Sequence, residues 1–196
     1  MVVLMRNDWE EVYSADTFRN KNEYPSGEVV SFIMRNYGAL GHKELIHVLD
    51  MGCGWGNNLK FLKDKGFCGV GVDISKTAVQ HCKSSGYTAS VCDFSKLPFS
   101  DSSFDIVFDR QAIQHNTIEN IKKTLNEVKR VLKKGGVFFS IMISEADYDV
   151  DTTYITEKKA QKLLTDFKII SIDKQSRTYD NQKIKNESLI IHVQKI

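Results

Sequence analysis

Short apolar runs alternate with amphipathic helical patterns along this chain, and this alternation restricts its possible folds more than any other feature. Five runs rich in Val, Ile and Phe have the length of strands: 46–50, 68–73, 87–93, 104–109 and 136–144. Helical patterns lie between most of them, at 57–66, 75–86 and 116–136. Because strand–helix–strand crossovers are right-handed, this order builds a parallel sheet with helices on both faces. The sequence therefore predicts a doubly wound α/β fold.

The two ends of the chain depart from this rhythm. A helical pattern at 156–167 precedes two strand-like runs, 168–180 and 187–196, which predict a hairpin at the edge of the sheet. At the other end, residues 1–45 hold a polar segment with several aromatic residues and a predicted helix at 26–38. We expect this segment to pack beside the functional site.

Helix boundaries are marked by small residues. Ser75 stands where a helix should begin, and Gly66, Gly86 and Gly135 stand where helices should end. Without repeats or a linker, the 196 residues predict one domain, 1–196, in which 1–45 is a lid and helix segment and 46–196 is the ligand-binding core.

Charge and cysteine usage exclude several classes of protein. The formal net charge is +2, with both signs interspersed, so neither nucleic acid nor an anionic membrane is indicated as the main partner. The four cysteines form no C-x-x-C pair, which argues against a zinc knuckle or a redox dithiol. The apolar start is shorter than a signal-peptide core and no stretch could span a bilayer, so we expect a cytoplasmic protein.

Each of the first four predicted strands ends in or just before an aspartate: Asp50, Asp73, Asp93 and Asp109. In open α/β sheets, ligands bind beyond the carboxyl ends of the strands. Any one of these residues could instead cap a helix or form a turn. Four in register favour a shared, acid-rimmed binding site.

The loop after the first strand contains glycine at 52, 54 and 56, so its backbone can turn tightly and approach a ligand. A dinucleotide fingerprint would need glycine at the position of Asn57, which weakens the case for NAD. The carboxylate rim would also repel phosphates. S-adenosylmethionine instead offers an ammonium, a sulfonium, ribose hydroxyls and an adenine amine, all of which suit carboxylate acceptors.

With these features the chain resembles the class I S-adenosylmethionine-dependent methyltransferases. VLDMGCGWG (48–56) is similar to the first motif of that family, GVDIS (71–75) to its ribose motif, CDF (92–94) to its adenine motif and VLKKGGVFF (131–139) to the turn into its fifth strand. The resemblance implies a Rossmann-like, seven-stranded sheet in the order 3-2-1-4-5-7-6, with strand 7 antiparallel. The D-R-x-A-I stretch that begins at Asp109 is similar to small-molecule members of the family.

The resemblance also implies a site for S-adenosylmethionine and its product S-adenosylhomocysteine. The glycines would flank the methionine moiety, Asp50 would fix its ammonium, Asp73 would hold the ribose and Asp93 would accept from the adenine amine. The full set of implied cofactor-binding residues is Asp50, Gly52, Cys53, Gly54, Gly56, Asn57, Asp73, Ile74, Asp93, Phe94, Asp109 and Arg110.

Three of these residues have more specific implied roles. Ile74 would pack on one face of the adenine, and the backbone of Phe94 would meet the ring. Asp109, or its carbonyl, would close the site beneath the methionine part. This position departs from the commonest family pattern, which has a small residue there.

Methyl transfer is an in-line displacement that depends mostly on positioning, and a base matters only for a hydroxyl or a protonated amine. His115, just past the fourth strand, is the candidate base because its ordinary pKa of about 6.5 suits proton removal at neutral pH. Alternatively it ends a loop that caps the next helix with Asn116 and Thr117. His42, His47, His81 and His192 are interpreted as surface or strand residues.

Four aromatic residues in the N-terminal segment, Trp9, Tyr13, Phe18 and Tyr24, are candidates for an apolar lid over the site, although ordinary packing would explain them equally well.

The leading hypothesis is a methyltransferase acting on a small molecule, as a monomer or homodimer. Arg19, Lys21 and Arg110 could meet an anionic acceptor, and the loop at 145–151 is expected to border its pocket. That loop begins like a calcium site but has Thr152 and Lys158 where glycine and an acid are needed, so we predict no metal.

Other functions remain open at this point. A base-amine methyltransferase should carry an (Asn/Asp)-Pro-Pro-aromatic turn where this chain has 109–112, DRQA, and no basic arm is evident, so nucleic acid is disfavoured. The alternatives are a methyltransferase acting on a protein or RNA, a non-catalytic subunit that binds S-adenosylmethionine and, furthest from the motifs, a nicotinamide oxidoreductase.

Overall fold

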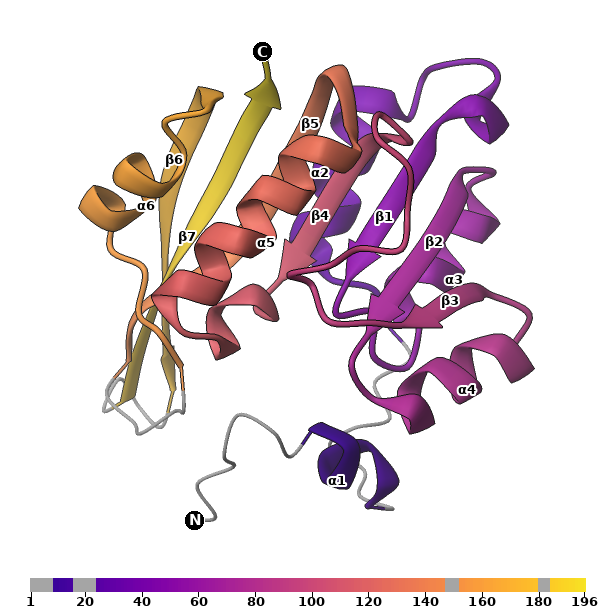
Figure 1. Cartoon of the computed structure of the whole chain (residues 1–196), viewed down its shortest axis with the longest axis horizontal. Helices are drawn as coiled ribbons and strands as arrows, with labels where there is room; N and C mark the ends of the chain where they lie inside the picture. The colour runs from indigo at the N-terminus through magenta and orange to yellow at the C-terminus, as the bar shows by residue number, and fades with distance from the viewer. Residues whose placement is uncertain (1–8, 16–23, 147–151, 180–183) are drawn as a thin grey trace.

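The computed structural model describes residues 9–15, 24–146, 152–179 and 184–196. Seven strands form one sheet in the order β3-β2-β1-β4-β5-β7-β6 (Figure 1). The strands are β1 (His47–Met51), β2 (Cys68–Asp73), β3 (Thr88–Val91), β4 (Phe104–Arg110), β5 (Leu132–Ala146), β6 (Phe167–Tyr179) and β7 (Ile184–Lys195). The pairings among β1 to β5 are parallel, whereas β7 is antiparallel to β5 and β6. The predicted fold, strand order and reversed seventh strand are confirmed.

Helices cover both faces of the sheet (Figure 1). On one face lie α2 (Gly27–Tyr37), α3 (Asn57–Asp64) and α4 (Lys76–Ser84), and on the other lie α5 (Ile118–Val131) and α6 (Glu157–Leu163). A separate buried apolar cluster lies under each layer. In the cluster under α2, α3 and α4, the rings of Phe32 and Phe139 stack with centroids 4.2 Å apart, which fixes α2 against β5.

Three short helices complete the described part of the chain: α1 (Trp9–Ser14), η2 (Lys43–Leu45) and η3 (Ile113–His115). α1 lies beyond the carboxyl ends of the first strands (Figure 1). Among the described residues, none of the helices has both the length and the apolar character needed to cross a membrane.

Most predicted helix boundaries are confirmed. The hydroxyl of Ser75 accepts a hydrogen bond from the Ala78 N–H at the start of α4, and Gly66 and Gly86 have left-handed backbone just after α3 and α4. The predicted helical segment 116–136 was too long. It ends at Val131, and the next residue, Leu132, is fully buried and starts β5, so tertiary burial overrides the helical period there.

Gly135 therefore does not end a helix as predicted. It lies within the first residues of β5, where the pairing with β4 shifts register between Phe104 and Ile106. Its left-handed φ of 77° fits such an irregular start of a strand.

Candidate functional site

The loop that follows β1 passes through left-handed backbone at all three of its glycines. The φ angles are 77° at Gly52, 49° at Gly54 and 79° at Gly56. At Gly52 there is also no room for a side chain, because a Cβ would lie 2.3 Å from the Cβ of Ala112. The loop therefore requires glycine for its backbone shape and, at Gly52, for close packing against the residues after β4.

Gly52→Ala should therefore lower the free energy of unfolding by roughly 2 kcal/mol or more, since it combines an unfavourable φ with overpacking. Gly27→Ala is the matched control, because a Cβ on Gly27 meets nothing within 4 Å. Urea unfolding of both variants measures the difference. Equal stability of the two would contradict the packing described for this loop.

Two of the four strand-end aspartates are buried beside this loop. Asp50 is 1% exposed, and its Oδ2 is buried with no hydrogen-bond partner in the described structure. Burial is the main reason that the pKa of Asp50 lies well above its ordinary value; a hydrogen bond with Asn58 opposes the shift. Asp50 thus offers an unsatisfied acceptor that a cationic or hydrogen-bond-donating group would stabilise.

Asp73 is also buried, and both of its carboxylate oxygens hold the surrounding backbone. Oδ2 accepts from the Gly54 N–H at 3.0 Å and Oδ1 accepts from the Ser75 N–H at 2.9 Å. Burial raises the pKa of Asp73 in spite of these hydrogen bonds. Since each carboxylate oxygen can accept more than one hydrogen bond, Asp73 retains acceptor capacity for two hydroxyls.

The residues implied for adenine binding surround the same edge of the sheet. Asp93 is exposed after β3, and its Oδ1 accepts from the Ser95 N–H at 2.7 Å. Ile74 is an apolar side chain left 52% exposed at the rim. Phe94 reaches the glycine loop, because its Cζ lies 3.8 Å from where a Gly52 Cβ would be.

Asp109, like Asp73, has hydrogen bonds to both of its carboxylate oxygens, and one of its donors is a side-chain hydroxyl. It is fully buried; Oδ1 accepts from the N–H groups of Ala112 and Ile113, and Oδ2 accepts from the Ser140 hydroxyl at 2.8 Å. Burial raises its pKa to about 6. The carboxylate thus caps η3, in line with the capping alternative considered for such residues.

The η3 turn carries His115 and is held from both sides. On one side lie the two hydrogen bonds from its backbone to Asp109. On the other side, Gln114 is fully buried. Its side-chain Oε1 accepts a hydrogen bond from the Ile143 N–H at 2.6 Å, and its backbone carbonyl accepts one from the Thr153 N–H at 2.9 Å. His115 therefore stands on a rigid turn, with its ring centroid 4.9 Å from that of Trp9.

The helix α1 lies over the glycine loop. The Tyr13 hydroxyl is 2.5 Å from where a Cβ of Gly54 would be, and the Tyr13 ring packs edge-on against Trp55. Glu10 accepts hydrogen bonds from the hydroxyls of Ser75 and Thr77. These hydrogen bonds, chiefly the one from Thr77 and next the one from Ser75, lower the pKa of Glu10 to about 2. Two of the predicted lid aromatics, Trp9 and Tyr13, thus lie at the site.

The other predicted residues lie in different parts of the structure or outside its described residues. Cys53 is buried, and a Cβ on Gly71 would lie 2.7 Å from its Sγ. Asn57 donates to the Tyr24 carbonyl at 2.6 Å, and the Tyr24 side chain itself is 79% exposed. Arg110 lines a separate hollow. Phe18, Arg19, Lys21 and most of the 145–151 loop lie outside the described residues.

Sequence reasoning missed two contributors to the site. Ala112 fills the space left by Gly52, and its only sequence signal is its small size. Glu10 ties α1 to α4, but one acid in a polar segment carries no signal of such a contact.

The chemistry of this edge fits S-adenosylmethionine. The glycine cradle is lined by buried carboxylates, one with an unpartnered oxygen, and an exposed apolar side chain lies at its rim. These groups match a ligand that brings cations, hydroxyls and an aromatic ring. Within the described residues no group of three or more His, Cys, Asp or Glu side chains could hold a metal ion.

Comparison with known proteins agrees with this geometry. Residues 49–140 match the family model described as a methyltransferase domain. The sterol 4-C-methyltransferase strm-1 of Caenorhabditis elegans is 32% identical over 117 residues, which are 55% of this chain and 34% of that protein. The tRNA (carboxymethyluridine(34)-5-O)-methyltransferase alkbh8 of Xenopus tropicalis is 33% identical over 118 residues, 59% of this chain and 18% of that protein. The chain thus spans about a third or less of these two relatives.

Solved structures share the fold. A crystal structure of a SAM-dependent methyltransferase from Methanosarcina mazei has a TM-score of 0.69 at 22% identity and covers 84% of this chain and 97% of its own. Its fold, the methyltransferase-domain match and the strand order agree. Residues 49–140 thus match a methyltransferase domain, and the sheet has the strand order that the resemblance to the class I S-adenosylmethionine-dependent methyltransferases implied.

Proposed function

We propose that the chain transfers the methyl group of S-adenosylmethionine to a small-molecule acceptor. The observation that carries this proposal is the buried, unpartnered Oδ2 of Asp50 beside the left-handed glycine loop. A buried carboxylate oxygen without a partner is costly, and a cationic ligand would offset that cost. The geometry therefore favours a site that is completed by a positively charged molecule.

The residues around the loop would hold the cofactor in three parts. Asp50 would bind the ammonium, Asp73 the ribose hydroxyls and Asp93 the adenine amine. Ile74 and Phe94 would pack around the adenine. Cys53 and Asn57 would support the glycine loop without contacting the cofactor through their side chains. When bound, S-adenosylmethionine supplies an electrophilic methyl group on a sulfonium. The chain supplies orientation and, through Trp9 and Tyr13 of α1, exclusion of water.

His115 would remove a proton from the acceptor where the acceptor is a hydroxyl or a protonated amine. Its support is positional: η3 follows β4 directly and is fixed by Asp109 and Gln114. A base held on a rigid turn keeps its alignment with the acceptor during the reaction.

His115→Ala should lower kcat by about 10² or more while leaving the dissociation constant of S-adenosylhomocysteine within about twofold. His47→Ala is the matched control, because His47 is exposed at the opposite end of β1. Kinetics and calorimetry on both variants separate the roles. Loss of folding stability with unchanged turnover would instead assign His115 to the structure of η3.

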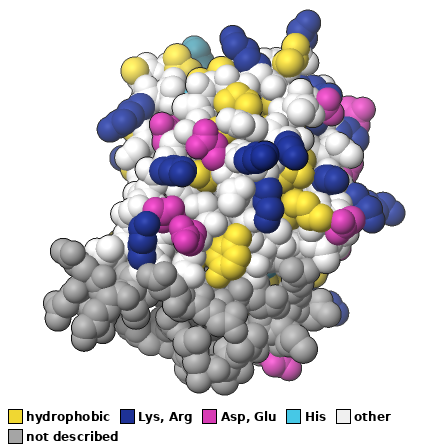
Figure 2. Space-filling view, turned by 90° about the vertical axis from the view of Figure 1, so that its left-hand side faces the viewer, with side chains coloured by type: hydrophobic (Ala, Val, Ile, Leu, Met, Phe, Trp, Pro, Cys, Tyr) yellow, Lys and Arg dark blue, Asp and Glu magenta, His cyan; other side chains and the backbone are white. Residues whose placement is uncertain are grey.

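The acceptor class is argued from the surface and from the relatives. On the face that Figure 2 shows, Lys and Arg side chains of the described residues are interspersed with Asp and Glu and form no continuous basic field. Such a mixed surface gives little attraction to a nucleic acid backbone. One similar protein is named for a sterol and another for a tRNA, so relatives support both small-molecule and RNA acceptors.

The proposal is tested with S-adenosylmethionine carrying a tritiated methyl group and a cell extract separated into dialysable, RNA and protein fractions. We expect label in a dialysable product. Label in RNA or protein would assign the acceptor to that class instead. Binding of S-adenosylhomocysteine with no label in any fraction would favour a non-catalytic binding subunit.

A further inference from the structure

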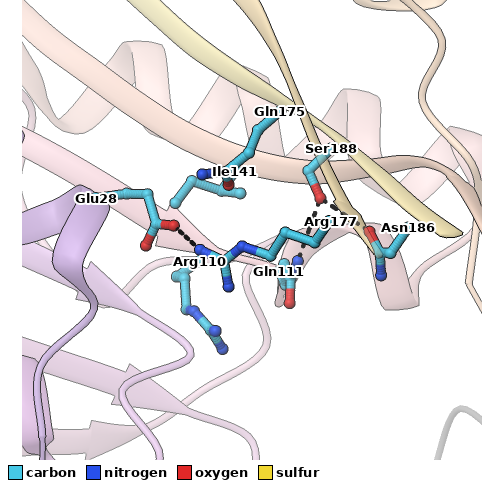
Figure 3. Close-up of a pocket in the computed structure, with 8 residues that line it drawn as sticks. All are labelled: Glu28, Arg110, Gln111, Ile141, Gln175, Arg177, Asn186 and Ser188. Carbon is cyan, nitrogen blue, oxygen red and sulfur yellow. Dashed lines mark hydrogen bonds and ion pairs between the residues drawn. The ribbon is translucent and has the colours of Figure 1, made fainter. Parts of the chain in front are cut away.

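A polar hollow of about 110 Å³ opens beside the cofactor edge of the sheet. Figure 3 shows the side chains that line it: Glu28, Arg110, Gln111, Ile141, Gln175, Arg177, Asn186 and Ser188. They come from α2, from the end of β4, from β5 and from the hairpin of β6 and β7. None of them belongs to the glycine loop or to the strand-end aspartates.

Strand register places these side chains on one face of the sheet. Gln175 pairs with Ser188 and Arg177 with Asn186 across β6 and β7. Arg110 pairs with Ile141 across β4 and β5, on the face that α2 covers. Because alternate residues of a strand share a face, a row of polar side chains runs from the hairpin to the end of β4.

The hollow is polar almost throughout. Gln111 Nε2 lies 3.5 Å from the Ser188 hydroxyl, which donates to Asn186 Oδ1 at 3.3 Å. Ser188 and Asn186 are nevertheless buried, at 5% and 8% exposed. Gln111 has left-handed backbone, with φ at 59°, which is costly for a residue other than glycine. A strained, polar wall of this kind suits a hydrogen-bonding ligand and not an apolar one.

The charges in the hollow sum to one positive charge. Arg177 forms an ion pair with Glu28, and Ser26 also donates to that carboxylate. Although burial acts to raise it, the pKa of Glu28 lies below its ordinary value because of the Ser26 hydrogen bond and the Arg177 charge. Arg110 has no ion pair among the described residues, so its guanidinium is available for a ligand. A monoanion is favoured over a dianion, which Glu28 would repel.

The position of the hollow connects it to the cofactor site. Asp109 pairs with Met51, the residue before Gly52, and Arg110 is the next residue along β4. The hollow therefore starts one residue from the strand pair that supports the glycine loop. An acceptor anchored there would extend toward the edge where the cofactor is held.

We propose that this hollow binds the carboxylate of a small carboxylic-acid acceptor, with Arg110 as its main ion-pair partner. This inference rests on the proposed function, since it names the substrate class of that same enzyme. Guanidinium groups bind carboxylates through paired, charge-assisted hydrogen bonds, and the amide and hydroxyl groups that also line the hollow can bind a further polar group of the acid.

The test uses lactate and mandelate as probes, each against its neutral amide, and saturation-transfer NMR on the full chain with and without S-adenosylhomocysteine. We expect both acids to bind more tightly than their amides. Arg110→Gln should weaken binding of the acids about tenfold or more, equivalent to about 1.4 kcal/mol. Glu28→Gln, which removes the ion-pair partner of Arg177, should strengthen binding of the acids. Arg35→Gln is the control, an exposed arginine on α2 that does not line the hollow.

Three results would overturn the inference: no binding of either acid, equal binding of acids and amides, or equal effects of Arg110→Gln and Arg35→Gln. If Arg110→Gln weakened the binding of S-adenosylhomocysteine to the same degree as the binding of the acids, Arg110 would belong to the cofactor site. That result would also overturn the inference. Failure of the proposed function is distinguishable, because then S-adenosylhomocysteine itself does not bind the unaltered chain.

Discussion

Asp109→Asn should raise the free energy of unfolding at about pH 8 by up to about 3 kcal/mol. Asp109 is fully buried, and burial raises its pKa from 3.8 to about 6. Asparagine retains an oxygen for the N–H groups of Ala112 and Ile113 and an amide for the Ser140 hydroxyl, without the buried charge. The variant should therefore be more stable wherever the native carboxylate is ionised.

The same substitution should remove a pH dependence of stability. Because the folded pKa of Asp109 is raised, the folded state keeps its proton to higher pH than the unfolded chain. The contribution of Asp109 to the free energy of unfolding is therefore largest below about pH 4, falls as the pH rises to about 6 and stays low above that. Urea unfolding across this window measures it.

Asp64→Asn is the control, because Asp64 is exposed and forms a surface ion pair with Lys60, worth about 1 kcal/mol or less. A loss of stability at about pH 8 in Asp109→Asn, or an unchanged pH profile, would show that the ionised carboxylate stabilises η3 and would contradict this account.

Asp73→Ala should raise the dissociation constant of S-adenosylhomocysteine by about tenfold or more, since charge-assisted hydrogen bonds contribute roughly 1.5–3 kcal/mol. Titration calorimetry measures the constant. The substitution also leaves the N–H groups of Gly54 and Ser75 without their acceptor, so stability should fall as well. The measurement therefore belongs at a temperature where the variant is shown to be folded.

Asp73→Asn separates the two effects. It keeps an oxygen for one backbone N–H but removes the negative charge, so its stability should lie nearer the unaltered chain while its affinity remains low. Affinity within about twofold of the unaltered chain in both variants would contradict the assignment of Asp73 to the ribose.

The sheet could be predicted from sequence because its strands are apolar runs separated by helical periods, and the family resemblance supplied their order. The start of β5 could not be predicted in this way. Residues 132–135 continue the helical pattern of α5, and only the burial of Leu132 against Phe104 on a neighbouring strand decides for strand. Such a contact between residues far apart in the chain leaves no local signal.

The same distinction holds for the site. The positions of Asp50 and Asp73 follow from strand ends and the glycine loop, which are local features. That Asp109 caps η3 depends on Ser140, 31 residues away, and on the close approach of Ala112 to Gly52. The polar hollow draws Glu28 and Arg177 from opposite ends of the chain, so no motif could predict it.

We expect the buried carboxylates at the carboxyl edge of the sheet to receive a cationic, donor-rich nucleoside. Calorimetric titration of the full chain with S-adenosylhomocysteine and, separately, with NAD⁺ tests it most directly. We predict saturable binding of S-adenosylhomocysteine and none of NAD⁺, whose phosphates the carboxylates repel. Tighter binding of NAD⁺, or no binding of S-adenosylhomocysteine, would contradict the account.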